Sequence, residues 1–218
     1  MDIKNNVLYR AWIRLVFPYK LSAFLDDKKV LDYVREAKEN KLINDRMFEK
    51  AHYKWKDIDP LGIILYAAVR STKPKVVIET GVQSGISSMY ILMAMKANSV
   101  GVLYSVDLPD RDPKKVGEVV PDELKENWHL YLGDSKALLP QIIDEIKAPV
   151  DIFFHDSLHT YDHMLYEFEW GLKYLSEYGL ITSHDILWND AFDEFCTEHS
   201  LNDLKLYNIG LIKRQNKK

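Results

Sequence analysis

No disulfide bond can form within this chain, because its 218 residues include a single cysteine, Cys196. A lone cysteine is typical of proteins that work in a reducing compartment, and we expect a cytoplasmic protein. No apolar run approaches the roughly 18 residues that a membrane span requires. The first residues, Met1–Asn6, include an acid and no small-residue cleavage site, so we expect no secretory signal there.

The chain also lacks an excess of positive charge. Its 29 basic and 33 acidic residues give a formal net charge of -4, and the pI is near 6.0. Because nucleic-acid backbones are bound by concentrated positive charge, this balance argues against a nucleic-acid-binding protein. An apolar fraction of 47% over 218 residues is enough to form the core of one sizeable α/β domain.

Glycine is scarce, and its most informative positions lie in the stretch Lys75–Ser88. The β-branched run Val76–Ile78 is followed by Glu79, Gly81 and Gly85, and then by a helical pattern. The dinucleotide fingerprint Gly-x-Gly-x-x-Gly and the lysine of a triphosphate-binding loop are both missing. Glycines allow a ligand to approach the backbone closely, and the start of a helix offers free N–H groups. An acid at the strand end suits a nucleotide that carries an ammonium and a sulfonium.

From Lys75 onward the sequence alternates between strand and helix patterns. The predicted strands are 76–79, 100–106, 128–132, 150–155 and 179–183, and the predicted helices are 84–97, 135–146, 160–176 and 190–199. Such alternation predicts a Rossmann-like, doubly wound α/β fold with a mostly parallel sheet. Two last strands, 204–207 and 210–213, predict a terminal hairpin that adds an antiparallel strand.

The first 71 residues carry helical patterns and no strand signal. We therefore predict an N-terminal helical extension, 1–71, with breaks at Pro18 and Asp59-Pro60, before a cofactor-binding domain, 72–218. Such an extension suits either a lid over the site or the contact surface of a homodimer. The segment Ala11–Lys20 is apolar with flanking bases, and we expect it to pack on the domain or on a second subunit rather than on a membrane surface.

Polar residues follow the predicted strands at their carboxyl ends, where open α/β sheets bind ligands. The second strand ends in Asp107, whose carboxylate could accept hydrogen bonds from both hydroxyls of a ribose. The third is followed by Asp134 and Ser135. Asp134 could accept a hydrogen bond from the amino group of an adenine, although either residue could instead cap the next helix.

The fourth and fifth strands lead into two His-Asp pairs, His155-Asp156 and His184-Asp185. Adjacent parallel strands lie about 4.8 Å apart, so Asp156 and Asp185 could share one divalent cation such as Mg²⁺. His184 as a third ligand would favour a transition metal, because imidazole prefers borderline ions. We expect His155 to point into the core, and a site without a metal is the alternative.

Together these patterns resemble a known enzyme family. The pattern Glu-x-Gly-x-x-x-Gly at 79–85 is similar to motif I of the class I S-adenosylmethionine (SAM)-dependent methyltransferases. The pattern Asp-x-x-His-x-Tyr at 156–161, followed by a strand ending in His-Asp at 184–185, resembles their metal-dependent O-methyltransferase branch. That branch includes the catechol-type and the macrolide and sugar O-methyltransferases. The resemblance covers about 75–213.

The resemblance implies a role for each matching residue. In cofactor binding, the methionine part would contact Glu79, Gly81 and Ser87, and Gly85 would belong to the same binding turn. The ribose would contact Asp107, and the adenine would contact Asp134 and Ser135. In the metal site, the ligands would be Asp156, Asp185 and His184, the last of which replaces an acidic ligand of catechol-type members. The catalytic residues would be Asp156 and His159, which stands where catechol-type members carry a lysine base.

The leading hypothesis is therefore a SAM-dependent methyltransferase that methylates an oxygen of a small hydroxylated substrate with help from a divalent cation. A non-catalytic SAM-binding subunit is one alternative. A metal-dependent hydrolase that uses the His/Asp cluster is another, although it leaves the glycine turn without a role. A dehydrogenase is the weakest alternative, because the third glycine is missing.

Overall fold

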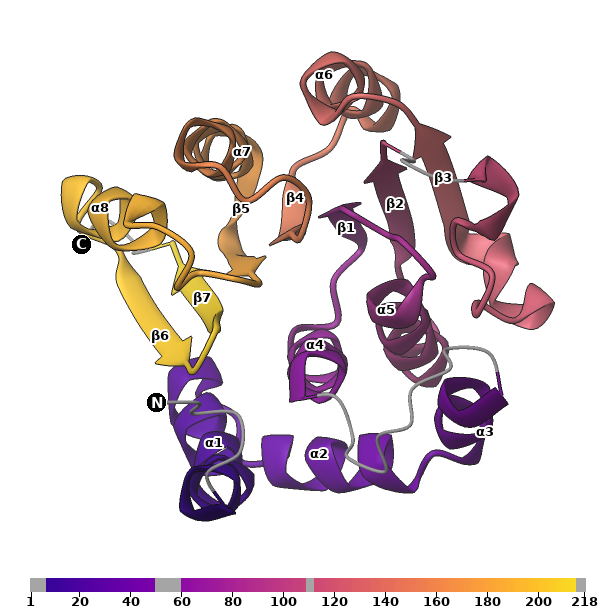
Figure 1. The fold of residues 1–218 in the computed structure, drawn as a ribbon, viewed down its shortest axis with the longest axis vertical. Coiled ribbons are helices and arrows are strands. Elements are labelled where there is room, and N and C mark those ends of the chain that lie inside the picture. The colour runs from indigo at the N-terminus through magenta and orange to yellow at the C-terminus, as the bar shows by residue number, and fades with distance from the viewer. Residues whose placement is uncertain (1–6, 50–59, 109–111, 215–218) are drawn as a thin grey trace.

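A seven-stranded sheet forms the centre of the molecule, and the computed structural model describes residues 7–49, 60–108 and 112–214 (Figure 1). The strand order is β3-β2-β1-β4-β5-β7-β6. The strands are β1 (Val76–Thr80), β2 (Val102–Asp107), β3 (Trp128–Leu132), β4 (Val150–His155), β5 (Leu175–Ser183), β6 (Asn202–Leu206) and β7 (Ile209–Lys213). The first five are parallel, and β7 is antiparallel to β5 and β6. The predicted doubly wound sheet with an antiparallel C-terminal strand is confirmed.

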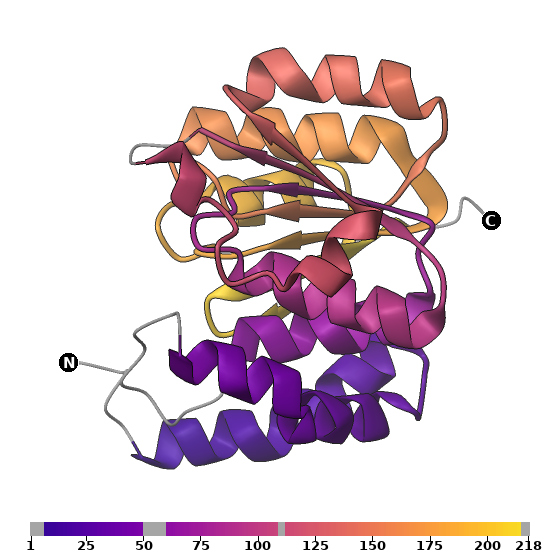
Figure 2. The same ribbon diagram turned by 90° about the vertical axis from the view of Figure 1, so that its right-hand side faces the viewer.

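Helices cover both faces of this sheet (Figure 2). On one face lie α6 (Ser135–Ile146), α7 (Tyr161–Tyr174) and α8 (Ala191–Glu198), and on the other lie α4 (Pro60–Thr72) and α5 (Ile86–Asn98). An outer layer packs against α4 and α5 and consists of α1 (Val7–Leu25), α2 (Val30–Glu39) and α3 (Lys41–Glu49). Each face of the sheet has its own apolar core, since the strands are buried between the two helical layers.

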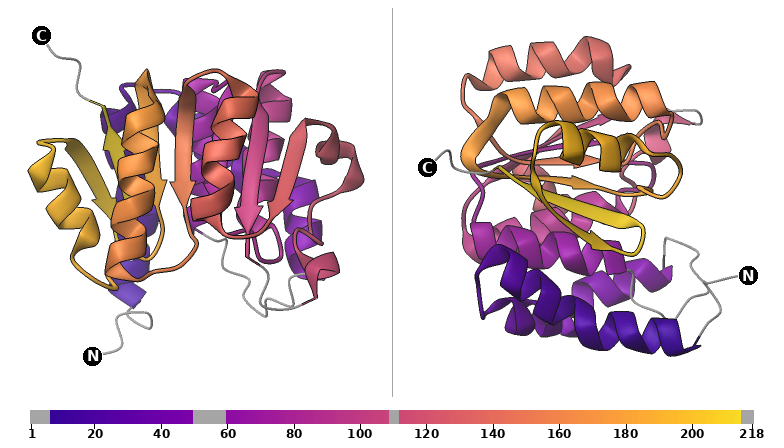
Figure 3. Two further views of the ribbon diagram at one scale, coloured as in Figure 1. Left: turned by 90° about the horizontal axis from the view of Figure 1, so that it is seen from above. Right: turned by 90° about the vertical axis from the view of Figure 1, so that its left-hand side faces the viewer.

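The helical N-terminal extension is confirmed, but the predicted break at Pro18 is wrong, because α1 continues through it. A proline inside a helix removes one backbone hydrogen bond. The burial of Phe17, Leu21 and Leu25 in the core shared with α4 offsets this loss. The extension packs on the domain, with α1 beside the β6–β7 hairpin (Figure 3). The predicted break at Asp59 lies outside the described residues.

No helix in the described part of the chain has the length and apolar character needed to cross a bilayer. Most element boundaries differ from the predictions by one or two residues, and the start of β5 differs by four. Helix α5 begins at Ile86, two residues late, because Gly85 adopts a left-handed conformation at φ 91°. Strand β5 begins four residues early at Leu175, which pairs with Val150 before a shift in register.

The register of the central strands places the site. Thr80 lies opposite His155 in the neighbouring strand, and His155 lies opposite Ser183 in the next. The residues that follow these three strands therefore emerge side by side at one edge of the sheet. Backbone hydrogen bonds continue there, from Asp156 N to Thr80 O at 2.8 Å and from His184 N to His155 O at 3.0 Å.

Candidate active site

The glycine turn after β1 is held by the carboxylate of Asp107. One oxygen, Oδ2, accepts hydrogen bonds from the backbone N–H groups of Val82 at 2.7 Å and Gln83 at 2.8 Å. Gly81 adopts φ 85°, a left-handed conformation that glycine reaches without strain. Asp107, predicted as a ribose ligand, thus also shapes the loop, and its Oδ1 accepts no hydrogen bond from the residues described.

Glu79, at the end of β1, is completely buried and bound by three hydroxyl groups. Ser87, Ser88 and Ser105 donate to its carboxylate at 2.5, 2.6 and 2.7 Å. Burial raises the pKa of Glu79 to about 7, although the three hydroxyls act in the opposite direction. The carboxylate ties the start of α5 to β2. Because Glu79 is completely enclosed in the folded chain, its contact with the methionine part of the cofactor stays a prediction.

A segment of the long connection between β2 and β3 lies across the glycine turn. The N–H of Gly117 donates to Gln83 O at 2.8 Å, and that of Val119 donates to Ser84 O at 3.0 Å. A Cβ atom on Gly85 would lie only 2.7 Å from the Cα of Gly117, so this close approach requires glycine. The connection also contains two short 3₁₀ helices, η2 (Pro113–Lys115) and η3 (Asp122–Asn127).

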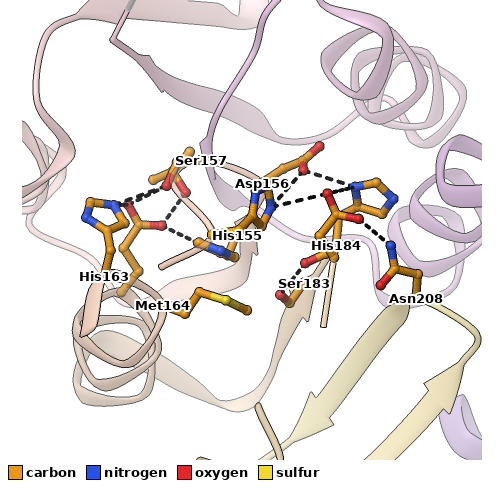
Figure 4. Close-up of polar contacts among 12 residues, drawn as sticks. His155, Asp156, Ser157, His163, Met164, Ser183, His184 and Asn208 are labelled. Atoms are coloured by element: carbon orange, nitrogen blue, oxygen red, sulfur yellow. Dashed lines mark hydrogen bonds and ion pairs between the residues drawn. The ribbon is translucent and has the colours of Figure 1, made fainter. Parts of the chain in front are cut away.

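Three predicted metal ligands meet beyond β4 and β5. One ligand atom each of Asp156, His184 and Asp185 lies within 4.8 Å of the other two. His184 Nδ1 is 3.1 Å from Asp156 Oδ1 and 3.6 Å from Asp185 Oδ2 (Figure 4). Asp185 takes a left-handed conformation at φ 54°, and the side-chain N–H of Asn208 donates to its Oδ1. These three residues are called the acidic triad below.

His159, the predicted base, faces both carboxylates of the triad. Its Nε2 is 3.4 Å from Asp156 Oδ1 and 3.8 Å from Asp185 Oδ2. This nitrogen is buried and has no hydrogen-bond partner among the described residues. Burial alone would raise the pKa of Asp156, but His159 and His184 outweigh burial and hold it below its usual value.

A second buried cluster surrounds Glu167 of α7, a residue that was not among the predicted site residues. Five side chains contact its carboxylate: His155 Nδ1, Thr80 Oγ1 and Ser135 Oγ at 2.6 Å, His163 Nε2 at 2.9 Å and Ser157 Oγ at 3.0 Å. Burial alone would raise the pKa of Glu167, but hydrogen bonds from the two histidines, aided by the charge of His155, hold it well below its usual range. Figure 4 shows the side chains of His155, Ser157 and His163 directed toward one another.

The Glu167 cluster accounts for two predicted residues. His155 is fully buried, which confirms the prediction that it points into the core. Ser135 donates to Glu167, and its neighbour Asp134 caps α6 by accepting from Lys136 N at 2.7 Å; the adenine contacts predicted for the two residues stay predictions. The structure thus favours the capping role for Asp134.

The sequence did contain one signal for Glu167. It lies three residues after Met164 and one before Phe168, so it falls on the apolar stripe of α7 that faces the sheet. An acid in such a stripe is buried and needs partners. Asn208, in the turn between β6 and β7, carried no comparable signal.

The glycine turn and the acidic triad are in direct contact. A Cβ atom on Gly81 would lie 1.9 Å from the backbone oxygen of Asp156, so only glycine fits between the two loops. Asp156 is also hydrogen-bonded through its N–H to Thr80, the residue before this glycine. A ligand in the glycine turn would therefore lie next to the triad.

A doubly wound sheet with a glycine turn and acids at its carboxyl edge is typical of the nucleotide-binding α/β proteins. A family model described as a methyltransferase domain (Methyltransf_24) matches residues 78–186, half of the chain, and the chain belongs to this family. The protein is a SAM-dependent methyltransferase of class I, as the resemblance in its sequence implied.

Solved structures with the same fold agree with this assignment. The O-methyltransferase from Bacillus cereus in complex with SAH is 16% identical, with a TM-score of 0.64 over 81% of this chain and 92% of that one. The O-methyltransferase TomG from Streptomyces achromogenes, in complex with SAM, is 16% identical, with a TM-score of 0.64 over 82% and 91%. SAH-bound PaMTH1 from Podospora anserina is 15% identical, with a TM-score of 0.60 over 87% and 97%. At these identities the likeness concerns the fold alone, and no curated protein matches the sequence.

Proposed function

We propose that this methyltransferase transfers the methyl group of SAM to an oxygen of a small hydroxylated substrate, with a divalent cation at the acidic triad. The observation that carries the proposal is the contact between Gly81 and Asp156. It puts the triad beside the turn where the cofactor would lie. The similarity to methyltransferases gives the hydrolase alternative no support.

The residues of the triad suit a cation. One ligand atom of each residue lies within 4.8 Å of the other two, so the three could contact one cation, and carboxylate and imidazole are common ligands of divalent ions. The buried Nε2 of His159, which faces the two carboxylates without a hydrogen bond, is a polar atom that a substrate hydroxyl at the triad would satisfy. Asp156, His184 and Asp185 would hold the ion, with Asn208 orienting Asp185.

In the proposed mechanism, the residues of the chain mainly position the reactants. A bound cation would lower the pKa of the acceptor hydroxyl. His159, close to both carboxylates of the triad, would take the proton from that hydroxyl. Asp107 would hold the ribose through its Oδ1 and keep the glycine turn in place through its Oδ2. The gain in rate would come from alignment of the oxygen, methyl carbon and sulfur.

We also keep the division into an extension, 1–71, and a SAM-binding domain, 72–218, as a proposal. Helix α4 crosses the boundary by one residue and shares its core with the sheet, so the extension would form one wall of the site. A homodimer formed through the extension stays a prediction, and so does the cytoplasmic location.

Calorimetric titration with S-adenosylhomocysteine tests cofactor binding. We expect micromolar binding by the full chain and at least tenfold weaker binding by Asp107→Ala, because the turn loses its anchor. The matched control is Asp144→Ala, an exposed residue of α6, which should bind like the wild type. Absence of binding by the wild type would overturn the methyltransferase proposal.

Titration with Mn²⁺ or Mg²⁺ tests the cation separately. Asp185→Asn removes one charge from the triad and should weaken Mn²⁺ binding at least tenfold. Asp190→Asn changes an exposed residue of the same loop that lies outside the triad, and it should have no effect. Equal Mn²⁺ affinity in both variants would remove the cation from the triad while leaving cofactor binding intact.

A further inference from the structure

A cavity of about 130 Å³ opens beside the acidic triad, between the N-terminal extension and the β6–β7 hairpin. Its walls are mainly apolar and come from three separate parts of the chain. The buried apolar lining residues are Phe17 of α1, Leu61 and Ile64 of α4, Leu206 of β6 and Ile209 of β7, and Pro60 and Tyr207 also line the cavity. All five side chains are at least nine-tenths buried, so they form a fixed wall.

Two polar residues connect this cavity to the triad. His184 lines the cavity and is also a member of the triad. Asn208 lines the cavity as well, and its side chain bonds both Asp185 Oδ1 and the N–H of Leu187. A molecule whose hydroxyl group lies at the triad can therefore extend directly into the cavity.

The lining determines which chemical groups fit. A dry cavity of about 150 Å³ lined by Leu, Ile and Phe is large enough to bind benzene. A polar ring would leave its hydroxyl groups without partners against the five apolar side chains, and burying an unpaired hydroxyl group is unfavourable. The cavity thus suits one compact apolar group of about six carbons and disfavours a sugar ring.

We propose that the methyl acceptor is an alcohol or phenol with one compact apolar group, which occupies this cavity while the hydroxyl lies at the triad. This inference rests on the proposed function, because it assigns the rest of the same substrate. It makes Ile64 and Leu61 specificity-determining residues. It also gives the N-terminal extension a direct part in substrate selection, since three of the five apolar wall residues belong to α1 and α4.

Fluorine NMR on the full chain, with saturating S-adenosylhomocysteine and Mg²⁺, tests the proposal with two probes. The apolar probe is 4-fluorobenzyl alcohol, and the polar probe is 3-fluoropropane-1,2-diol. The wild type should bind the aromatic alcohol at least tenfold more tightly than the diol. Ile64→Trp fills the cavity and should weaken the aromatic alcohol at least tenfold. The matched control is Val100→Trp, which places the same ring on an exposed loop and should bind both probes like the wild type.

Binding of S-adenosylhomocysteine in the same samples separates the two levels of the proposal. If Ile64→Trp retains the cofactor but binds the aromatic alcohol as tightly as the wild type, the cavity is not the acceptor site. Equal affinity for the two probes in the wild type would also overturn the inference. If Ile64→Trp fails to fold, Leu61→Phe adds less volume at the rim and must give the same selective loss. Failure of the wild type to bind S-adenosylhomocysteine would instead refute the proposed function, whereas selective aromatic binding without cofactor would still support the cavity.

Discussion

The Glu167 cluster should be one of the most sensitive points in the fold. Oε1 of Glu167 receives contacts from Ser135, Ser157 and His163, and Oε2 receives contacts from Thr80 and His155. Glu167→Gln keeps the shape of the side chain but turns one of these oxygens into an amide N–H donor. Whichever way the amide is oriented, its N–H group then faces the ring nitrogen of His155 or His163 that had contacted a carboxylate oxygen, and the hydroxyls on that side must turn to accept.

The size of the effect follows from these contacts. Breaking a fully buried, hydrogen-bonded charge pair by changing one partner typically costs about 3–5 kcal/mol. For a chain of this length, each kcal/mol lowers the melting temperature by about 2–4 °C, so we expect a decrease of roughly 10 °C. Urea denaturation should show the same loss as a lower midpoint with an unchanged slope.

The stability difference between the wild type and Glu167→Gln should also depend on pH. The pKa of Glu167 is lowered in the folded protein, so its ionised form stabilises the fold above the pKa of the unfolded chain, about 4.5. That contribution disappears as the pH falls further. Wild type and Glu167→Gln should therefore differ most near pH 7 and converge in acid.

A matched control lies two residues away on the same helix. Glu169 pairs with His199 at 2.7 Å, but its side chain is 53% exposed. Glu169→Gln should cost less than about 1 kcal/mol, because exposed ion pairs contribute little. If Glu167→Gln were as stable as Glu169→Gln, the cluster would not be an ionic network.

Three further predictions concern the cofactor and triad loops. The pKa of Glu79 is raised to about 7 in the folded protein, whereas the unfolded chain ionises near 4.5. The free energy of unfolding of the wild type should therefore fall by about 3 kcal/mol, relative to that of Glu79→Gln, as the pH rises from 4.5 to 7. A difference between the two that stays constant with pH in urea denaturation would contradict this. Gly81→Ala places a Cβ atom against the backbone of Asp156 and puts an alanine in a left-handed conformation. It should lower the free energy of unfolding by at least about 2 kcal/mol and abolish S-adenosylhomocysteine binding measured by calorimetry. Retained binding would mean that the two loops move apart easily. His159→Ala should leave cofactor affinity within twofold but lower kcat for any accepted alcohol by about 10²-fold or more, and full activity would remove His159 from the mechanism.

The fold class was predictable from local patterns. A buried parallel strand appears as a continuous apolar run, and a helix that covers it shows a period of 3.6 residues. Val150–His155 and Ser135–Ile146 were therefore predicted with the bounds that the structure shows. Boundaries failed where a single backbone conformation decides them, as at Gly85, or where tertiary packing overrides a local rule, as at Pro18 inside α1.

The residue types of the site were also evident from the sequence, since acids at the ends of adjacent parallel strands must lie near one another. The structure confirms that Asp156, His184 and Asp185 come together. The partners of these acids could not be predicted. Asp107 binds the backbone of the turn, and Glu79 is enclosed by hydroxyls, because each orients toward donors that only the folded chain supplies.

The sequence by itself determined the alternation of strands and helices, the glycine turn and the acids at the sheet edge, because these depend on neighbours in the chain. Only the tertiary structure decided the Glu167 cluster and the apolar cavity. Thr80 and Glu167 are 87 residues apart, and the cavity joins Phe17 to Ile209. Contacts between such distant segments depend on how helices pack on both faces of the sheet, and no local pattern encodes that arrangement.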